Sequence, residues 1–240
     1  MDISLFLYKK EYLASHTVGL YFDRKNYQYD FFPGQYVSIT LPIVPSDGNG
    51  ATRDFTITSS PTEKNMLLIM TKEGITDAKK ALTNLSPGQS VTCTKPQGGF
   101  YLREEDISPR IFLSGGVGIA PFYSMITYNI DKNLHIPMTL IASFSSSEDA
   151  VLFDDLSEIA STHAEIKVIY SISHIDASEV LVHQENGRIS EGMIKKYAGE
   201  LDTSLFMIAG SPEMVDDTQD LLVRMGISGK NIQSEQFPGY

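Results

Sequence analysis

The stretch Leu113-Ser114-Gly115-Gly116-Val117-Gly118-Ile119-Ala120-Pro121 decides the fold of this 240-residue chain. An apolar run, Ile111–Leu113, leads into three glycines, and an apolar segment containing Pro121 follows. Proline suits a first helical turn, because the N–H group that it lacks has no partner there. The stretch therefore predicts a strand, a tight turn and a helix. Such turns hold the diphosphate of a dinucleotide, but a plain strand-to-helix connection is an equal alternative from these residues alone.

Downstream of this turn, apolar runs alternate with segments of helical pattern. We expect strands at 111–113, 138–144, 166–171, 205–209 and 232–236, and helices at 121–129, 149–162, 191–197 and 212–225. This alternation is typical of βαβ units and a parallel sheet. Ligands of such sheets bind beyond the carboxyl ends of the strands, so the residues after each strand are the candidates for chemistry.

Upstream of the turn, short apolar and β-branched runs are separated by proline and glycine. We expect strands at 3–13, 18–22, 35–41, 53–59, 66–71 and 90–94, with one helix at 77–85. This spacing predicts a small antiparallel barrel or sandwich. The expected fold is therefore an antiparallel β-barrel domain over residues 1–104, followed by an α/β parallel-sheet domain over residues 109–240.

Composition excludes several classes of function. With 19 basic and 30 acidic side chains the net charge is −11, which argues against a non-specific nucleic-acid binder. The one cysteine, Cys93, excludes an internal disulfide and a multi-cysteine metal cluster, and we expect no metal site. The N-terminus lacks the pattern of a signal peptide, and glycines and Pro121 interrupt the charge-free stretch 111–130. We therefore expect a cytoplasmic monomer without a membrane span.

Three further motifs could carry chemistry, each with a plain structural alternative. In Arg53–Pro61, an arginine suited to phosphate and an aromatic alternate with polar residues along a strand. In Phe206–Met214, a strand ends in a glycine turn and Pro212 opens a helix. At the terminus, Glu235 lies two residues from Phe237. The alternatives are an ordinary strand, a routine loop and a free tail.

Together and in this order, the motifs resemble those of the ferredoxin–NADP reductase superfamily over essentially the whole chain. The flavin motif R-x-[YF]-[ST] is matched by Arg53, Phe55 and Thr56. The nicotinamide motif G-G-[TV]-G-I-x-P is matched by Gly115 to Pro121, and C-G-P-P-x-M is matched in part by Gly210, Pro212 and Met214. The resemblance implies an FAD-binding barrel, an NAD(P)-binding α/β domain, and hydride transfer from NADH or NADPH to FAD.

The resemblance also implies roles for individual residues, and Arg53 would pair with the diphosphate of FAD. Thr56 would hydrogen-bond flavin N5, Glu235 would relay protons or hold nicotinamide, and Phe237 or Tyr240 would cover the second face of the flavin. The implied cofactor-binding set is Arg53, Asp54, Phe55, Thr56, Met70, Thr71, Gly74, Ile75, Thr76, Gly115, Gly116, Val117, Gly118, Pro121, Ala209, Gly210, Ser211, Pro212, Met214 and Tyr240.

Some residues depart from the family pattern. Ala209 stands where relatives usually have cysteine, Val117 where many have threonine, and Ser211 in place of the first proline. These departures keep open a redox-silent nucleotide-binding subunit of a larger complex. A free-flavin or ferric reductase is the second alternative.

The choice of nucleotide and of electron acceptor is less defined. No lysine or arginine stands in Ser145–Asp149 or Tyr170–His174, which favours NADH, although serines can hold the phosphate of NADPH. The resemblance implies an acceptor such as ferredoxin, flavodoxin, an oxygenase component or a small molecule.

Overall fold

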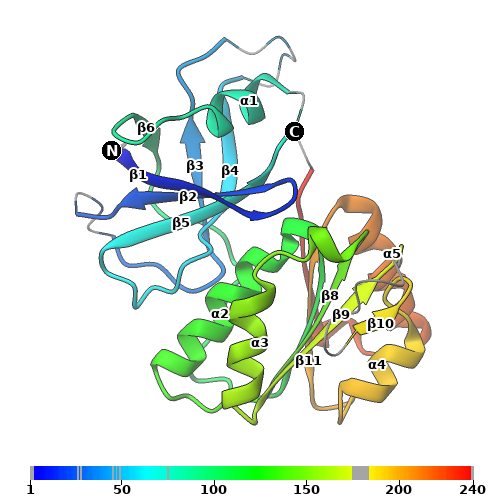
Figure 1. The fold of residues 1–240 in the computed structure, drawn as a ribbon. Helices are drawn as coiled ribbons and strands as arrows, with labels where there is room; N and C mark the ends of the chain where they lie inside the picture. Colours follow the sequence, from blue (N-terminus) through cyan, green and yellow to red (C-terminus); the bar gives the residue numbers. More distant parts are fainter. Residues whose placement is uncertain are drawn as a thin grey trace.

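The computed structural model describes residues 3–25, 27, 29–44, 46, 48, 50–74, 76–174 and 184–238. Two of the residues expected to bind cofactor, Ile75 and Tyr240, lie outside the described residues. The described chain forms two six-stranded sheets, one above the other in Figure 1.

The first sheet is antiparallel and has the strand order β4-β3-β6-β1-β2-β5. Its strands are β1 (Ile3–Ala14), β2 (Thr17–Asp23), β3 (Tyr36–Thr40), β4 (Thr52–Thr56), β5 (Met66–Lys72) and β6 (Ser90–Cys93). An isolated bridge between Ile57 and Ile69 brings the two outer strands together, so the sheet curls into a barrel. The helix α1 (Asp77–Thr83) covers its core with the buried Ala78 and Leu82.

The second sheet is parallel and has the strand order β10-β9-β8-β7-β11-β12. Its strands are β7 (Arg110–Gly115), β8 (Met138–Phe144), β9 (Ile166–Ile172), β10 (Gln184–Asn186), β11 (Leu205–Gly210) and β12 (Ile232–Gln236). The helices are α2 (Ala120–Asp131), α3 (Phe153–Thr162), α4 (Glu191–Tyr197) and α5 (Pro212–Arg224).

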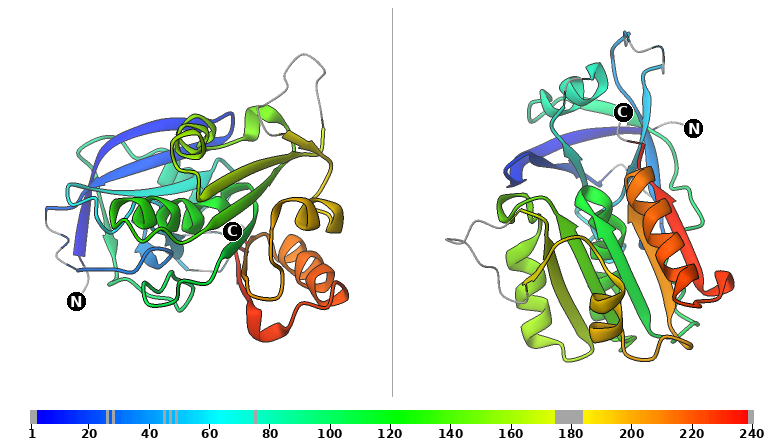
Figure 2. Two further views of the ribbon diagram at one scale, coloured as in Figure 1. Left: turned by 90° about the horizontal axis from the view of Figure 1, so that it is seen from below. Right: turned by 90° about the vertical axis from the view of Figure 1, so that its right-hand side faces the viewer.

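Helices cover both faces of the parallel sheet, as the right-hand view of Figure 2 shows. Alternate residues of β7 point to opposite faces: Phe112 joins the core beneath α2 and α3, whereas Ile111 and Leu113 join the core beneath α4 and α5. Burial on both faces explains why the central strands β7, β8, β9 and β11 are largely apolar, whereas the edge strands β10 and β12 are polar.

The fold class predicted from the sequence is confirmed, with two local differences. The helix expected from residue 149 begins at Phe153, because Ser147–Asp149 form a 3-10 turn and Leu152 takes a left-handed conformation. The strand β10 was not expected, because its three residues are polar and carry no apolar pattern.

The charge-free stretch 111–130 is shared among β7, a 3-10 turn (Gly116–Ile119) and α2. Within the described part of the chain, every helix is too short or too polar to cross a membrane. The domain limits at 104 and 109 stay a prediction.

The two halves of the chain are packed together. Met70, Phe100 and Leu102 from the first half belong to the apolar core beneath α2 and α3. The Ser124 hydroxyl on α2 donates to the Ser59 carbonyl at 2.8 Å, and the Ser15 amide donates to the Glu148 carbonyl at 3.0 Å. Apolar packing and hydrogen bonds therefore hold the barrel against the parallel sheet.

We expect Asn129→Ala to lower the free energy of unfolding by about 1–3 kcal/mol, because buried backbone groups of Ile136 lose their partners. The side-chain Nδ2 atom of Asn129 donates to the Ile136 carbonyl at 3.1 Å, and its Oδ1 atom accepts from the Ile136 N–H at 3.0 Å. Urea unfolding measures the loss. The exposed Gln219 on α5 supplies the control, Gln219→Ala, and an equal effect of both substitutions would contradict the role of Asn129.

Candidate active site between the barrel and the parallel sheet

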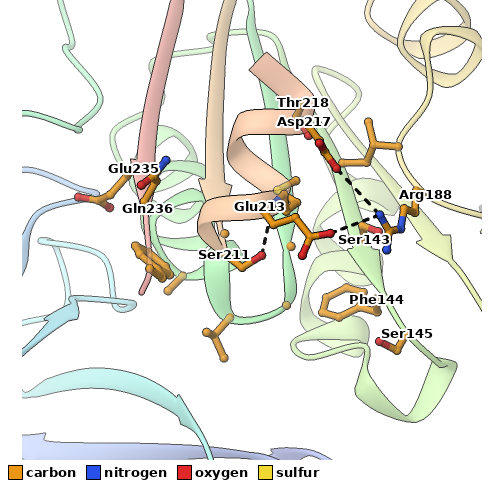
Figure 3. Close-up of a pocket in the computed structure, with 18 of the residues that line it drawn as sticks. Ser143, Phe144, Ser145, Arg188, Ser211, Glu213, Asp217, Thr218, Glu235 and Gln236 are labelled. Carbon is orange, nitrogen blue, oxygen red and sulfur yellow. Dashed lines mark hydrogen bonds and ion pairs between the residues drawn. The ribbon is translucent and has the colours of Figure 1, made fainter. Parts of the chain in front are cut away.

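A cleft of about 1400 Å³ opens where the carboxyl ends of β7, β8, β9, β11 and β12 meet the barrel. Residues from both halves line it, and Figure 3 shows the part formed by the parallel sheet and α5. The residues expected from the sequence that line it are Asp54, Phe55, Thr56, Met70, Thr71, Gly115, Gly116, Val117, Gly210, Ser211, Met214, Glu235 and Phe237. The structure thus brings together Asp54 and Phe237, which are 183 residues apart in the sequence.

The glycine turn after β7 forms one wall of the cleft. Gly116 has a φ of +54°, a left-handed conformation that glycine adopts at little cost. Gly118 is buried behind the wall, where an added Cβ atom would lie 2.2 Å from the Ala209 carbonyl oxygen. Gly118 therefore permits close packing of the turn on β11 and does not itself line the cleft.

The end of β11 forms a second turn beside the first. An added Cβ atom on Gly210 would lie 2.9 Å from Met214 Sδ and 3.3 Å from the Gly115 nitrogen. The Ser211 hydroxyl caps α5 by accepting from the Met214 amide at 3.4 Å. The two glycine turns are thus neighbours at one edge of the sheet, with Met214 packed over both.

Three expected residues shape these turns without lining the cleft. Ala209 is fully buried, and Pro121 is buried in the first turn of α2. Pro212 opens α5 immediately after its cap. The replacement of cysteine by Ala209 consequently lies behind the surface of the cleft.

The barrel supplies the opposite wall from β4 and β5. Asp54, Phe55 and Thr56 line the cleft together with Met70 and Thr71. Phe55 and Met70 offer apolar surface, and Thr56 offers a hydroxyl, which is a combination that suits a flat heteroaromatic ring.

Arg53 does not line the cleft. Its side chain is buried, and its Nη1 atom donates to the carbonyls of Gly50 at 2.7 Å and Thr52 at 2.9 Å. The guanidinium thus holds the backbone that leads into β4.

Two lysines, Lys72 and Lys79, bring positive charge to the junction of the two halves. An added Cβ atom on Gly116 would lie 3.8 Å from the Lys72 ammonium nitrogen, so this lysine reaches over the glycine turn. The Lys79 side chain packs against Gly74, and burial and the neighbouring Lys72 lower the pKa of Lys79. Because the charges of these two ammonium groups interact, an anion bound in this part of the cleft would be favoured.

Gly74 and Thr76, which lie between the two lysines in the sequence, determine the position of Lys79. The Thr76 hydroxyl caps α1 by accepting from the Lys79 amide at 3.3 Å. Neither Gly74 nor Thr76 lines the cleft, but the cap and the missing side chain of Gly74 determine where Lys79 lies.

Glu235 projects into the cleft from the end of β12, opposite Ala209 in the register of the sheet. Its Oε2 atom is buried, and no described residue donates a hydrogen bond to it. Burial and the negative charge of Asp54 raise the pKa of Glu235 to about 7. A carboxyl with this pKa can hold or release a proton near neutral pH.

Phe237 lies two residues after Glu235, and the backbone amide of Phe237 donates to the Gly210 carbonyl at 2.7 Å. This bond places the aromatic side chain at the cleft beside the second glycine turn.

Sequence reasoning missed several residues of the cleft. Lys72 is the last residue of β5 and Lys79 lies on α1, and lysines at such positions are commonly solvated. Arg188 follows the unexpected strand β10, and the acidic residues of α5 lack any motif. The carboxyl-end rule did indicate the loops after β8 and β9, whose Ser145 and Ser173 line the cleft. No group of metal-ligating side chains is found among the described residues.

Comparison with known proteins identifies the second half of the chain. Residues 112–220 match the family model of the oxidoreductase NAD-binding domain. The toluate 1,2-dioxygenase electron transfer component of Pseudomonas putida is 29% identical over 213 residues, which are 88% of this chain and 60% of that protein. The chain thus spans about three-fifths of the length of this relative.

Solved structures share the whole architecture. A cytochrome P450 reductase of Amycolatopsis superposes with a TM-score of 0.85 and 21% identity, covering 100% of this chain and 71% of that one. A ferredoxin NADP⁺ reductase of Neisseria gonorrhoeae with bound FAD and NADP has a TM-score of 0.80 and 19% identity, covering 100% and 98%. Residues 112–220 therefore match the oxidoreductase NAD-binding domain, and the chain as a whole shares the two-sheet fold of these solved reductases.

Proposed function

We propose that the chain is an FAD-containing reductase that takes a hydride from NAD(P)H and passes electrons to a separate acceptor. The observation that carries this proposal is that the glycine turns and the Asp54–Thr56 strand open into the same cleft. When bound, FAD supplies the chemistry by accepting a hydride at N5 and giving up electrons singly.

The cleft fits two dinucleotides in size and in chemistry. Its volume of about 1400 Å³ exceeds the roughly 300–1,000 Å³ of a pocket for one drug-sized ligand. Gly115, Gly116 and Gly210 leave backbone accessible at one wall, and Lys72 and Lys79 supply the cations that two diphosphates require.

On the barrel wall, we assign the residues to the flavin. Phe55 and Met70 would pack against the ring system, and Thr56 would hydrogen-bond N5. Asp54 and Thr71 would contact its polar edge. Lys79, beside Gly74, would hold the FAD diphosphate, with Thr76 positioning that lysine. The sequence motif assigns this diphosphate to Arg53, whose guanidinium already serves two backbone carbonyls.

On the sheet wall, we assign the residues to the nicotinamide nucleotide. Gly115, Gly116 and Val117 would meet its diphosphate together with Lys72 from the barrel. Gly210, Ser211 and Met214 would border the nicotinamide. The buried Gly118, Pro121 and Ala209 and the half-buried Pro212 would hold both turns in place. This arrangement would hold the two rings close together, and such positioning supplies much of the rate of a hydride transfer.

Glu235 and Phe237 would complete the junction. Phe237 would cover the second face of the flavin until nicotinamide displaces it. The unpartnered Oε2 atom of Glu235 would receive a hydrogen bond from the nicotinamide carboxamide or exchange a proton with the reduced ring.

The acceptor is proposed to be an oxygenase component. The Pseudomonas putida relative is an electron transfer component by name, which supports this choice over a free flavin or a ferric complex. The alternative of a redox-silent nucleotide-binding subunit is based in part on Ala209. This residue does not reach the surface of the cleft, which weakens that alternative.

The first test mixes FAD-loaded protein with NADH or NADPH in the absence of oxygen. We expect the visible absorbance of the oxidised flavin to bleach within seconds with at least one nucleotide, because the cleft brings both rings together. Stopped-flow absorbance measures the rate. Binding of both nucleotides without bleaching would exclude the reductase and support a redox-silent subunit.

Lys79→Gln should weaken FAD binding by about tenfold, since a charge-assisted contact to a diphosphate is lost. Lys72→Gln should weaken NAD⁺ binding by a similar factor and leave FAD content unchanged. Fluorescence of released FAD and calorimetry with NAD⁺ measure the two effects. The exposed Lys80 on the same helix provides the control Lys80→Gln, and an equal loss of FAD in this control would exclude a specific contact of Lys79.

Glu235→Gln should remove a titration near pH 7. The folded pKa of Glu235 lies above its ordinary value of 4.5, so the folded state holds this proton more tightly than the unfolded state. Between about pH 4.5 and 8, the free energy of unfolding of the native protein should therefore fall relative to Glu235→Gln, by roughly 1–3 kcal/mol. In the same variant, a plot of the rate of flavin reduction against pH should lose its inflection near pH 7. Parallel stability curves would contradict the raised pKa.

A further inference from the structure

Two arginines line the end of the cleft far from the barrel. Neither belongs to the loops after β8 and β9, where the sequence analysis looked for a cation. Arg188 comes from the segment after β10, and Arg224 comes from the last turn of α5. Their presence reopens the choice between NADH and NADPH, because an arginine is the usual partner of a 2′-phosphate. The choice depends on what surrounds these arginines.

Arg188 faces carboxylates (Figure 3). Its Nη1 atom lies 4.0 Å from Glu213 Oε1 and 4.0 Å from Asp217 Oδ2. Glu213 and Asp217 are four residues apart on α5, so they present their carboxylates on one face of the helix. The arginine therefore already has two anionic partners at the rim of the cleft.

The local charge at this end is negative. Among the described residues, Glu191, Glu213, Asp217 and Asp220 line it against Arg188 and Arg224, which gives a formal charge of −2 with His174 neutral. At the junction with the barrel, Lys72 and Lys79 offset the carboxyl groups of Asp54 and Glu235. A dinucleotide that spans the cleft would meet cations near its diphosphate and an excess of carboxylates at its far end.

The proposed function places the adenosine ribose at that far end. The nicotinamide has to meet the flavin on the barrel side, and the diphosphate lies at the glycine turns. The remaining part extends between α5 and the loops after β8 and β9, where Ser145, Ser173 and Ser190 line the cleft. Hydroxyl groups and carboxylates suit a ribose diol, which donates hydrogen bonds.

We propose that Glu213 and Asp217 make the cleft selective for NADH by engaging Arg188 and repelling the 2′-phosphate of NADPH. The inference rests on the proposed function and names its electron donor. Binding of NADPH requires that Arg188 leave its two partners and that a dianion approach an excess of carboxylates. NADH has no charge at this position and meets neither cost.

The experiment compares the FAD-loaded native protein with the double variant Glu213→Gln/Asp217→Asn. Calorimetry measures the dissociation constants of NAD⁺, NADP⁺, AMP and 2′-phospho-AMP, and stopped-flow absorbance measures flavin reduction by NADH and NADPH. The native protein should bind NAD⁺ at least about tenfold more tightly than NADP⁺. The double variant should bind NADP⁺ and 2′-phospho-AMP about five- to tenfold more tightly than the native protein, with NAD⁺ within about twofold.

Two further variants separate the contact from overall charge. Adding Arg188→Gln to the double variant should cancel the gain in 2′-phospho-AMP binding, because the released cation is then missing. Asp216→Asn removes a carboxylate from the same helix at an exposed position that does not line the cleft, and it should leave the preference unchanged. The preference should also shrink as ionic strength rises, since these charges are exposed.

A native protein that binds NADP⁺ as tightly as NAD⁺ would overturn the inference, as would a double variant with an unchanged preference. If neither nucleotide reduces the flavin, the proposed function fails. The relative affinity of AMP and 2′-phospho-AMP then still decides whether the carboxylates select against a 2′-phosphate.

Discussion

The close approach of the Gly118 backbone to the Ala209 carbonyl is the constraint on which the nucleotide half depends. With 2.2 Å between an added Cβ atom and that oxygen, no side chain fits at position 118 without displacing the turn. This contact holds the turn after β7 against the end of β11, and both turns open into the cleft as a result. Loss of binding in a variant with a larger residue here would therefore report a displaced turn and not a blocked diphosphate.

The barrel and the parallel sheet also have to be held in a fixed relative position, because the proposed chemistry needs groups from both halves of the chain. Met70 shows how this is achieved, since it lines the cleft on the barrel wall and also belongs to the core beneath α2. The hydrogen bond from Ser124 to the Ser59 carbonyl ties α2 to the segment that follows β4. The wall that presents Thr56 and the turn that presents Gly116 are thus held by shared packing, which suits a reaction sensitive to small displacements.

The sequence predicted the fold class because its signals were local. The strand, glycine turn and proline of residues 111–121 specify one unit of a parallel sheet, and the residues at its carboxyl edge follow from topology. The lysine pair and Arg188 could not be found in this way. Lys72 and Lys79 meet only after β5 and α1 pack together, and Arg188 follows a three-residue polar strand without a pattern. The raised pKa of Glu235 likewise depends on Asp54, which is 181 residues away.

The distribution of charge along the cleft matters more than the net charge of −11. Salt screens exposed charges beyond a distance of about 8–10 Å, so a bound nucleotide responds mainly to the groups that line its own site. Lys72 and Lys79 offset the negative charge of the protein where a diphosphate would lie. At the far end of the cleft, the carboxylates of α5 leave the charge negative. A molecule with its negative charge in the middle and a neutral ribose at one end matches this pattern in a single orientation. The same carboxylates that select against a 2′-phosphate would therefore also help to direct the nicotinamide toward the barrel.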